Sequence, residues 1–115
     1  MSREQLATRA YAAASVSRTT RQQEADVFRF VIAELQSARQ SDTIARVRAL
    51  ADNRRLWVAL TDLLQDDTNS LPPETRAGIV SIGRTVHREM ETDEPNFDFL
   101  ITINKNMADG LSGNP

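Results

Sequence analysis

The chain has 115 residues, a length that fits one domain with a modest core but not two domains with separate cores. Hydrophobic residues make up 40% and charged residues 26%, as in ordinary globular proteins, whereas 5% aromatic residues and 4 glycines argue against a β-rich fold. The formal net charge of −2 gives no overall field that would attract nucleic acid or an anionic membrane. Because the chain has no cysteine, disulfides, thiolate metal sites and a cysteine nucleophile are excluded.

The start of the chain does not have the pattern of a signal peptide. Arg3, Glu4 and Arg9 interrupt the stretch where a signal peptide has an unbroken apolar core. No apolar run elsewhere approaches the length of a membrane span. We therefore expect a cytoplasmic protein without membrane insertion.

A first helix is predicted over residues 2–14, where small apolar side chains recur at helical spacing on one face. The polar residues 15–18 predict a break in this helix. Thr20 and Gln23 then match a capping box, which predicts the start of a second helix that runs to about residue 40. The apolar stripe of the second helix comprises Val27, Phe28, Val31, Ile32 and Leu35.

A third helix, predicted to be the longest, begins at a cap formed by Ser41 or Asp42 and ends at the polar loop 66–70. Its apolar side chains cover a wide arc, which indicates a central helix in contact with several neighbours. The arc comprises Val47, Leu50, Ala51, Leu56, Trp57, Val58, Leu60, Leu63 and Leu64.

A fourth helix is predicted to start at Pro72 and Pro73, since the first turn of a helix tolerates the missing N–H of proline. Gly83 lies on its apolar face, where a glycine favours the close approach of another helix. The remainder of that face is formed by Ile79, Ile82, Val86 and Met90.

A last helix is predicted from about Asn96 to Gly110, followed by a flexible tail at residues 112–115. Four to five antiparallel helices joined by short links predict an all-α fold, a small helical bundle that forms one domain over residues 1–115. The apolar stripe of the last helix comprises Phe97, Leu100, Ile101, Met107, Ala108 and Leu111.

Residues suited to catalysis or metal binding are few. His87 is the only histidine, and its spacing of four residues from Glu91 favours a surface ion pair over a catalytic role. The carboxylates lack the spacing of a calcium loop, and no glycine-rich stretch is suited to holding a nucleotide. We therefore expect no enzyme activity, no catalytic residue, no cofactor and no metal site.

Two asparagines fall among apolar residues. Asn53 lies in the seam of the third helix between Leu50 and Trp57, and Asn104 lies at the centre of the last apolar stripe. An amide buried without partners costs about 1–3 kcal/mol, so each should hydrogen-bond the other helix's backbone, the other asparagine or a bound partner. Seam asparagines usually fix the pairing of helices, and we favour that role over direct contact with a ligand.

Two arginines follow Asn53. Arg54 falls on the flank of the apolar arc, where it needs a carboxylate partner, and Glu24 and Glu34 of the second helix are the candidates. Arg55 belongs to the polar strip of the third helix and is predicted to be exposed near acidic neighbours.

With these residues in view, the sequence resembles the flagellar biosynthesis regulator FlaF family over nearly the whole chain. One shared motif is N-R-x-L-W, present here as Asn53, Arg54, Leu56 and Trp57. Met107 departs from the family pattern, which usually has a branched aliphatic residue there, and Lys105 stands where arginine is common. The further matching positions are Tyr11, Glu24, Leu71, Pro72, Leu100, Ile101, Ile103, Asn104, Asn106, Ala108, Gly110 and Leu111.

The resemblance implies a non-enzymatic role in flagellar assembly, in which family members promote flagellin production and export and act against the translational repressor FlbT. It also implies flagellin binding in the manner of a secretion chaperone. A helical bundle could cover a terminal helix of flagellin by accepting it in an apolar groove. We place that groove beside the third and last helices, although a core role is favoured for Trp57. Its partner-binding residues would be Asn53, Arg54, Trp57, Leu60, Leu100, Asn104 and Met107.

Two other functions are open at this stage. An RNA-directed regulator would act on flagellin transcripts, alone or with FlbT, but the acidic balance and the scarcity of aromatic side chains count against it. A self-associating helical adaptor is the third hypothesis, while a monomer is favoured. The arginines considered for RNA binding are Arg18, Arg21, Arg46, Arg48 and Arg55.

Overall fold

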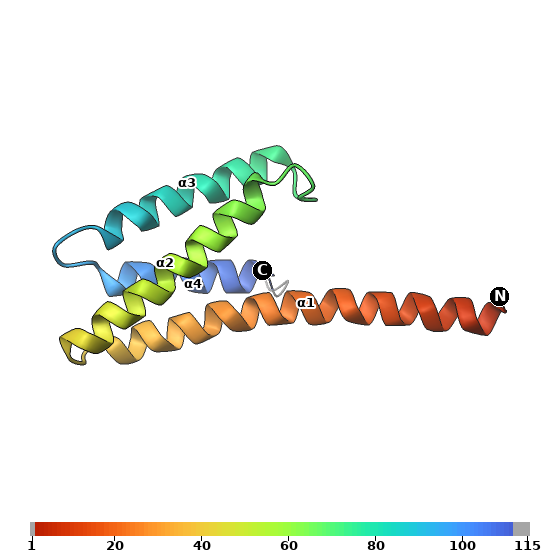
Figure 1. Ribbon diagram of the computed structural model, residues 1–115, viewed down its shortest axis with the longest axis horizontal. Coiled ribbons are helices and arrows are strands. Elements are labelled where there is room, and N and C mark those ends of the chain that lie inside the picture. Colours follow the sequence, from red (N-terminus) through yellow and green to blue (C-terminus); the bar gives the residue numbers. More distant parts are fainter. Residues whose placement is uncertain (1, 112–115) are drawn as a thin grey trace.

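The computed structural model describes residues 2–111, and within this part it describes the side chains of all residues except 10–22. The described part is folded into four helices, which confirms the predicted all-α bundle (Figure 1). The flexible tail predicted at residues 112–115 lies outside the described residues. The helices are α1 (Arg3–Ala38), α2 (Thr43–Gln65), α3 (Pro73–Met90) and α4 (Phe97–Leu111).

The predicted break in the N-terminal region is wrong, because α1 is continuous over 36 residues and is longer than α2, the helix expected to be the longest. Residues 15–18 include neither proline nor glycine, and serine, valine and arginine each cost well under about 1 kcal/mol inside a helix. The capping box is formed at Ser2 and Gln5, where each side chain accepts a hydrogen bond from the other residue's backbone N–H. The pair Thr20 and Gln23 lies inside the helix.

The starts of the other helices are set by capping side chains and a proline that can be recognised in the sequence. Asp42 caps α2 by accepting a hydrogen bond from the N–H of Ala45 at 2.8 Å. Pro73 occupies the first turn of α3. Asn96 accepts a hydrogen bond from the N–H of Phe99 at 3.0 Å at the start of α4. This last helix extends through Leu111, one residue beyond its predicted end.

The helices are arranged as two antiparallel layers in an elongated molecule of 62 × 29 × 23 Å (Figure 1). In one layer, α4 runs back along the C-terminal half of α1. In the other, α2 and α3 form a hairpin, and α2 crosses α1 close to the turn that joins them. The N-terminal part of α1 extends beyond the other three helices.

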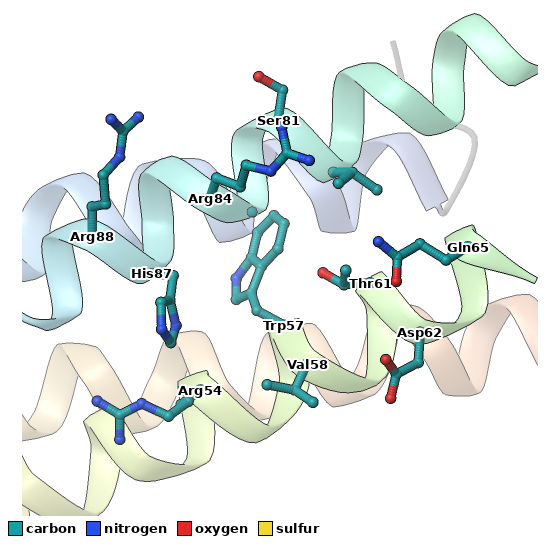
Figure 2. Close-up of a pocket in the computed structure, with 12 residues that line it drawn as sticks. Arg54, Trp57, Val58, Thr61, Asp62, Gln65, Ser81, Arg84, His87 and Arg88 are labelled. Atoms are coloured by element: carbon teal, nitrogen blue, oxygen red, sulfur yellow. The ribbon is translucent and has the colours of Figure 1, made fainter.

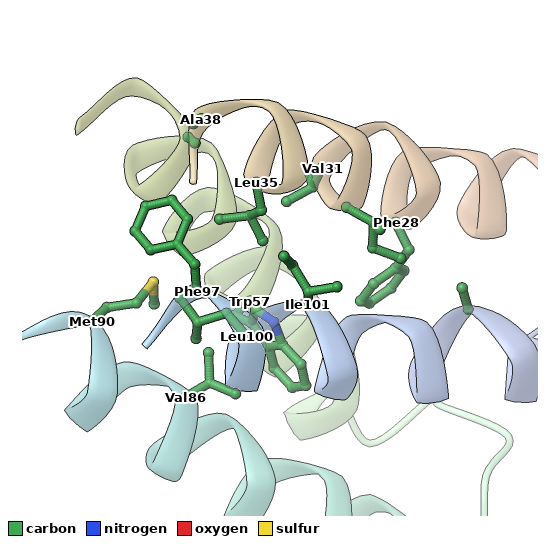
Figure 3. Packing of buried hydrophobic residues seen from close by; sticks show 13 residues of the cluster. Phe28, Val31, Leu35, Ala38, Trp57, Val86, Met90, Phe97, Leu100 and Ile101 are labelled. Atoms are coloured by element: carbon green, nitrogen blue, oxygen red, sulfur yellow. The ribbon is translucent and has the colours of Figure 1, made fainter. Parts of the chain in front are cut away.

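The core lies between the C-terminal half of α1 and the helices α2 and α4, and α3 adds Val86 and Met90 to it (Figure 3). Leu35 and Leu100 are fully buried at its centre. The rings of Phe28 and Trp57 meet edge to face, with centroids 6.2 Å apart. The buried apolar cluster comprises Phe28, Val31, Ile32, Leu35, Ala38, Ala49, Trp57, Val86, Met90, Phe97, Leu100, Ile101 and Ala108.

Several residues assigned to apolar faces from the sequence are exposed instead. A side chain in a wide apolar arc is buried only where another helix covers it, and α1, α3 and α4 leave parts of these arcs uncovered. The residues concerned are Val27 of α1, Val47, Val58 and Leu63 of α2, and Ile82 of α3.

α3 approaches α2 closely at Gly83, next to Trp57. A Cβ atom added to Gly83 would lie 3.3 Å from Cε3 of Trp57 and 3.4 Å from Oγ1 of Thr61. The close approach predicted for this glycine is therefore confirmed. Gly78, on the same helix, has no atom within 4 Å of the corresponding position.

These two glycines give a matched pair of expected results. Gly78→Ala should raise the free energy of unfolding by about 1 kcal/mol, because alanine is the better helix former. Gly83→Ala should lower it, since the new methyl group presses on a Trp57 ring that a hydrogen bond holds in place. Chemical denaturation of both variants measures the difference. Equal stabilisation by both substitutions would contradict the tight contact at Gly83.

Candidate functional site

A chain of buried hydrogen bonds connects α2, α4 and α3. The indole N–H of Trp57 donates to Oδ1 of Asn104 at 2.9 Å, and Nδ2 of Asn104 donates to Oδ1 of Asn53 at 2.7 Å. Nδ2 of Asn53 in turn donates to Sδ of Met90 at 3.1 Å. Both asparagines have no exposed surface. The polar residues of the two apolar stripes therefore satisfy each other, one of the three arrangements expected from the sequence.

The predicted partner-binding residues lie mostly inside the protein. Asn53, Asn104 and Leu100 are fully buried, and Trp57 is 3% exposed. The list is completed by Leu60 and Met107, which are half-buried against the core, and Arg54, which is exposed. Contact of these residues with a partner stays a prediction, and two of them, Arg54 and Trp57, border an open surface feature.

That feature is an open groove of about 720 Å³ between α2 and α3 (Figure 2). Along α2 it extends from Arg54 to Gln65, about 16 Å or three helical turns. The side chain of Val58 is half exposed within it. Its lining consists of Arg54, Trp57, Val58, Thr61, Asp62 and Gln65 of α2 and of Val80, Ser81, Gly83, Arg84, His87 and Arg88 of α3.

The predicted pairing of Arg54 with Glu24 or Glu34 is wrong. Arg54 is exposed at the rim of the groove, beside His87 of α3 (Figure 2). Glu34 lies near Asp52 and Arg48 instead. The flank of α2 that carries Arg54 faces the open side of the α2–α3 hairpin, so its guanidinium stays in water and needs no buried carboxylate.

Two predicted surface contacts with acidic neighbours are confirmed. Nε2 of His87 lies 3.1 Å from Oε1 of Glu91, four residues later on α3. Nη1 of Arg55 lies 3.0 Å from Oδ1 of Asp52, and the Arg55 side chain is 80% exposed. Exposed pairs of this kind contribute little to stability.

The arginines considered for RNA binding have separate surroundings in the structure. Arg46 packs over the ring of Phe97, with 4.8 Å between its Cζ and the ring centroid, and Arg55 pairs with Asp52. Arg48 lies near Glu34. The side chains of Arg18 and Arg21 are outside the described part of the chain.

Glu34 and Asp52 bring two carboxyl groups together where α1 crosses α2. Burial raises the pKa of the Glu34 carboxyl, the hydrogen bond and the negative charge of Asp52 raise it further, and Arg48 opposes these effects. Within the described residues, Oε1 of Glu34 is buried without a hydrogen-bond partner. Ionised Glu34 therefore destabilises the folded state at neutral pH.

Glu34→Gln is accordingly expected to increase the free energy of unfolding at pH 7. Because the folded-state pKa of Glu34 is raised, the gain is present above that pKa and disappears as the pH falls toward its ordinary value of 4.5. Thermal unfolding of both proteins between pH 4 and pH 8 provides the measurement. A gain that is constant across this range would show that charge on Glu34 is not its cause.

A second exposed apolar surface lies near this carboxyl pair. Phe30 is 65% exposed and Val27 is 50% exposed, four and seven residues before Glu34 on the same face of α1. We call Val27 and Phe30, on α1 beside its crossing with α2, the α1–α2 surface.

The α3 side of the groove was missed by sequence reasoning. Arg84, His87 and Arg88 recur at three- and four-residue spacing, which places them near one face of a helix. That spacing was the sequence feature that could have indicated a cationic face on α3. It did not reveal the groove, because the position of this face next to Arg54 and Val58 depends on how α3 packs on α2.

No group of three or more histidine and acidic side chains is arranged to hold a metal ion within residues 2–111. Over the same part of the chain, none of the helices combines the length and apolarity needed to cross a bilayer.

Comparison with known proteins finds a family that covers nearly the whole chain. The family model described as flagellar protein FlaF matches residues 7–111. No curated protein and no solved structure matches the sequence.

Proposed function

The chain belongs to the flagellar protein FlaF family, and from this premise we propose that it binds flagellin in the cytoplasm as a secretion chaperone and promotes flagellin synthesis and export. The groove between α2 and α3 accepts a helix of flagellin. Promotion of synthesis follows from this binding together with antagonism of the translational repressor FlbT. No chemical step is part of this function.

The observation that carries the proposal is the open groove itself. It contains the half-exposed Val58 and borders the Trp57 ring, so a docked helix would cover apolar surface next to the core. Its length of about three helical turns matches a short amphipathic helix that presents anchors at intervals of three and four residues. Flagellin is an aggregation-prone cargo before export, and a chaperone that covers one of its apolar faces would keep it dispersed.

The first experiment is co-purification of the protein with flagellin, followed by titration of purified flagellin at two salt concentrations. We expect a 1:1 complex whose affinity depends only weakly on salt, because apolar anchors supply most of the binding energy. A steep loss of affinity with salt, together with binding of the flagellin transcript leader, would instead support an RNA-directed regulator. Sedimentation of the protein alone tests the self-associating adaptor.

A pair of lysine substitutions locates the binding surface. Val58→Lys places a charge in the groove and should weaken flagellin binding by about tenfold or more. Phe30→Lys places the same charge on the α1–α2 surface and should change the affinity for flagellin by less than about twofold. Both side chains are at least half exposed, so both variants should fold. The opposite ranking would move the flagellin site to the α1–α2 surface.

A further inference from the structure

The rim of the α2–α3 groove is cationic although the protein as a whole has a formal net charge of −2. Three arginines and a histidine line the groove, against a single carboxylate, that of Asp62. Within the described part of the chain, neither Arg54 nor Arg84 has an ion-pair partner. These two guanidinium groups are therefore available to an anionic group on a bound molecule.

The charges are distributed unevenly along the groove. Because α2 and α3 are antiparallel, Arg54 of α2 lies beside His87 of α3 at one end (Figure 2). Arg84 extends over the middle, near Trp57. Asp62 and Gln65 lie toward the opposite end. A ligand with carboxylates at one end would be attracted in one orientation and repelled by Asp62 in the other.

The floor of the groove favours a protein segment over a nucleic acid. Val58 and Val80 provide aliphatic surface, which a sugar-phosphate backbone would not cover. The lining contains two aromatic side chains, Trp57 and His87. The Trp57 ring is 97% buried and held by Asn104, so it offers no platform for base stacking, and the His87 imidazole contacts Glu91. An apolar helix face fits this floor.

We propose that the α2–α3 groove is specific for an amphipathic helix whose apolar face rests on Val58 and Val80 and whose carboxylates, in the half away from Asp62, bind Arg54 and Arg84. This inference rests on the proposed function, since the helix is taken to be a segment of flagellin. Apolar contact supplies most of the affinity. The charged rim selects acidic segments and fixes their direction in the groove.

The test is a titration of purified flagellin against Arg54→Glu/Arg84→Glu, with Arg29→Glu/Lys105→Glu as the matched control. Both double variants change the charge equally at exposed positions, but Arg29 and Lys105 lie outside the groove. The groove variant should bind about tenfold more weakly, and the control should remain within about twofold of the original protein. Arg54→Gln/Arg84→Gln should lose less affinity for flagellin. Because this variant removes the two charges without reversing them, it controls for misfolding caused by the reversed charges.

A charge exchange completes the experiment. Overlapping flagellin peptides first locate the bound segment, and lysine then replaces the acidic residues at one of its ends. This exchanged peptide should restore the affinity of the Arg54→Glu/Arg84→Glu variant. Replacement of acidic residues at the other end should not restore this affinity, because the peptide binds in only one favoured orientation.

The outcomes separate the two proposals. Failure of the original protein to bind flagellin would overturn the proposed function and this inference with it. Normal binding by the original protein and by Arg54→Glu/Arg84→Glu would overturn this inference alone. If the double variant lost affinity for the transcript leader and kept its affinity for flagellin, the groove would be a site for RNA.

Discussion

Replacing Asn104 with leucine should lower the free energy of unfolding by about 3 kcal/mol, because it leaves two buried groups without partners. These groups are the indole N–H of Trp57 and Oδ1 of Asn53, which Asn104 now contacts at 2.9 and 2.7 Å. Leucine has the same branched arrangement of four side-chain heavy atoms as asparagine, so the loss of hydrogen bonds dominates. Denaturant unfolding, followed by the fluorescence of the single tryptophan, measures the change.

The control is a double-mutant cycle with Asn53→Leu. The Asn53→Leu/Asn104→Leu variant removes both amides together, so only the Trp57 N–H is orphaned. It should therefore be more stable than Asn104→Leu alone, with a coupling energy of about 2 kcal/mol. Additive losses in the cycle would show that the two amides do not depend on each other.

The same series tests the alternative role of Asn53 as a contact with a partner. Asn53 is fully buried and donates to Met90 while accepting from Asn104. We expect the double variant to keep flagellin binding at conditions where it is folded, because neither amide reaches the groove surface. Loss of binding by a stably folded double variant would assign the asparagines a role in recognition.

Replacing Trp57 with alanine should be the most destabilising of these substitutions, with a loss of about 4 kcal/mol. The ring is 3% exposed, meets Phe28 edge to face and donates to Asn104. Its removal leaves a large cavity and an unpaired carbonyl oxygen on Asn104. Thermal and chemical unfolding monitored by circular dichroism measure the loss, since the variant has no tryptophan.

Two further substitutions separate the contributions of the ring. Trp57→Phe keeps an aromatic ring and loses the N–H donor, so it should cost about 2 kcal/mol. Val58→Ala, at the adjacent half-exposed position, should cost less than about 1 kcal/mol. If Trp57→Ala were no more destabilising than Val58→Ala, the core assignment of Trp57 would be wrong.

The amino-acid sequence by itself determined the features that depend on near neighbours in the chain. Asp42, Pro73 and Asn96 mark helix starts because capping chemistry operates over one turn. The stripe of α4 faces the core because its period matches one face of a helix, with four of its members buried and Met107 and Leu111 partly buried. The need of Asn53 and Asn104 for polar partners followed from the cost of burying an amide.

The predictions from local sequence were wrong where the helical and non-helical conformations of a segment differ little in free energy. Residues 15–18 look like a break because they are polar, but helix propensities differ by less than about 1 kcal/mol and the helix continues. Thr20 and Gln23 carry the pattern of a capping box but lie inside the continuous helix α1. Residues that can cap a helix do not force a helix to start there. Here the backbone hydrogen bonds of α1 continue through them.

Only the tertiary structure decided which partner each polar residue finds and which apolar residues are covered. The contact of Asn53 with Asn104 joins residues 51 positions apart, and it depends on how α2 and α4 cross. Arg54 and Val58 lie in an open groove, since α3 packs at Gly83 and leaves the flank of α2 uncovered. Helical periodicity gives the direction of a side chain from its own axis, whereas the position of neighbouring axes is set by packing across the whole bundle.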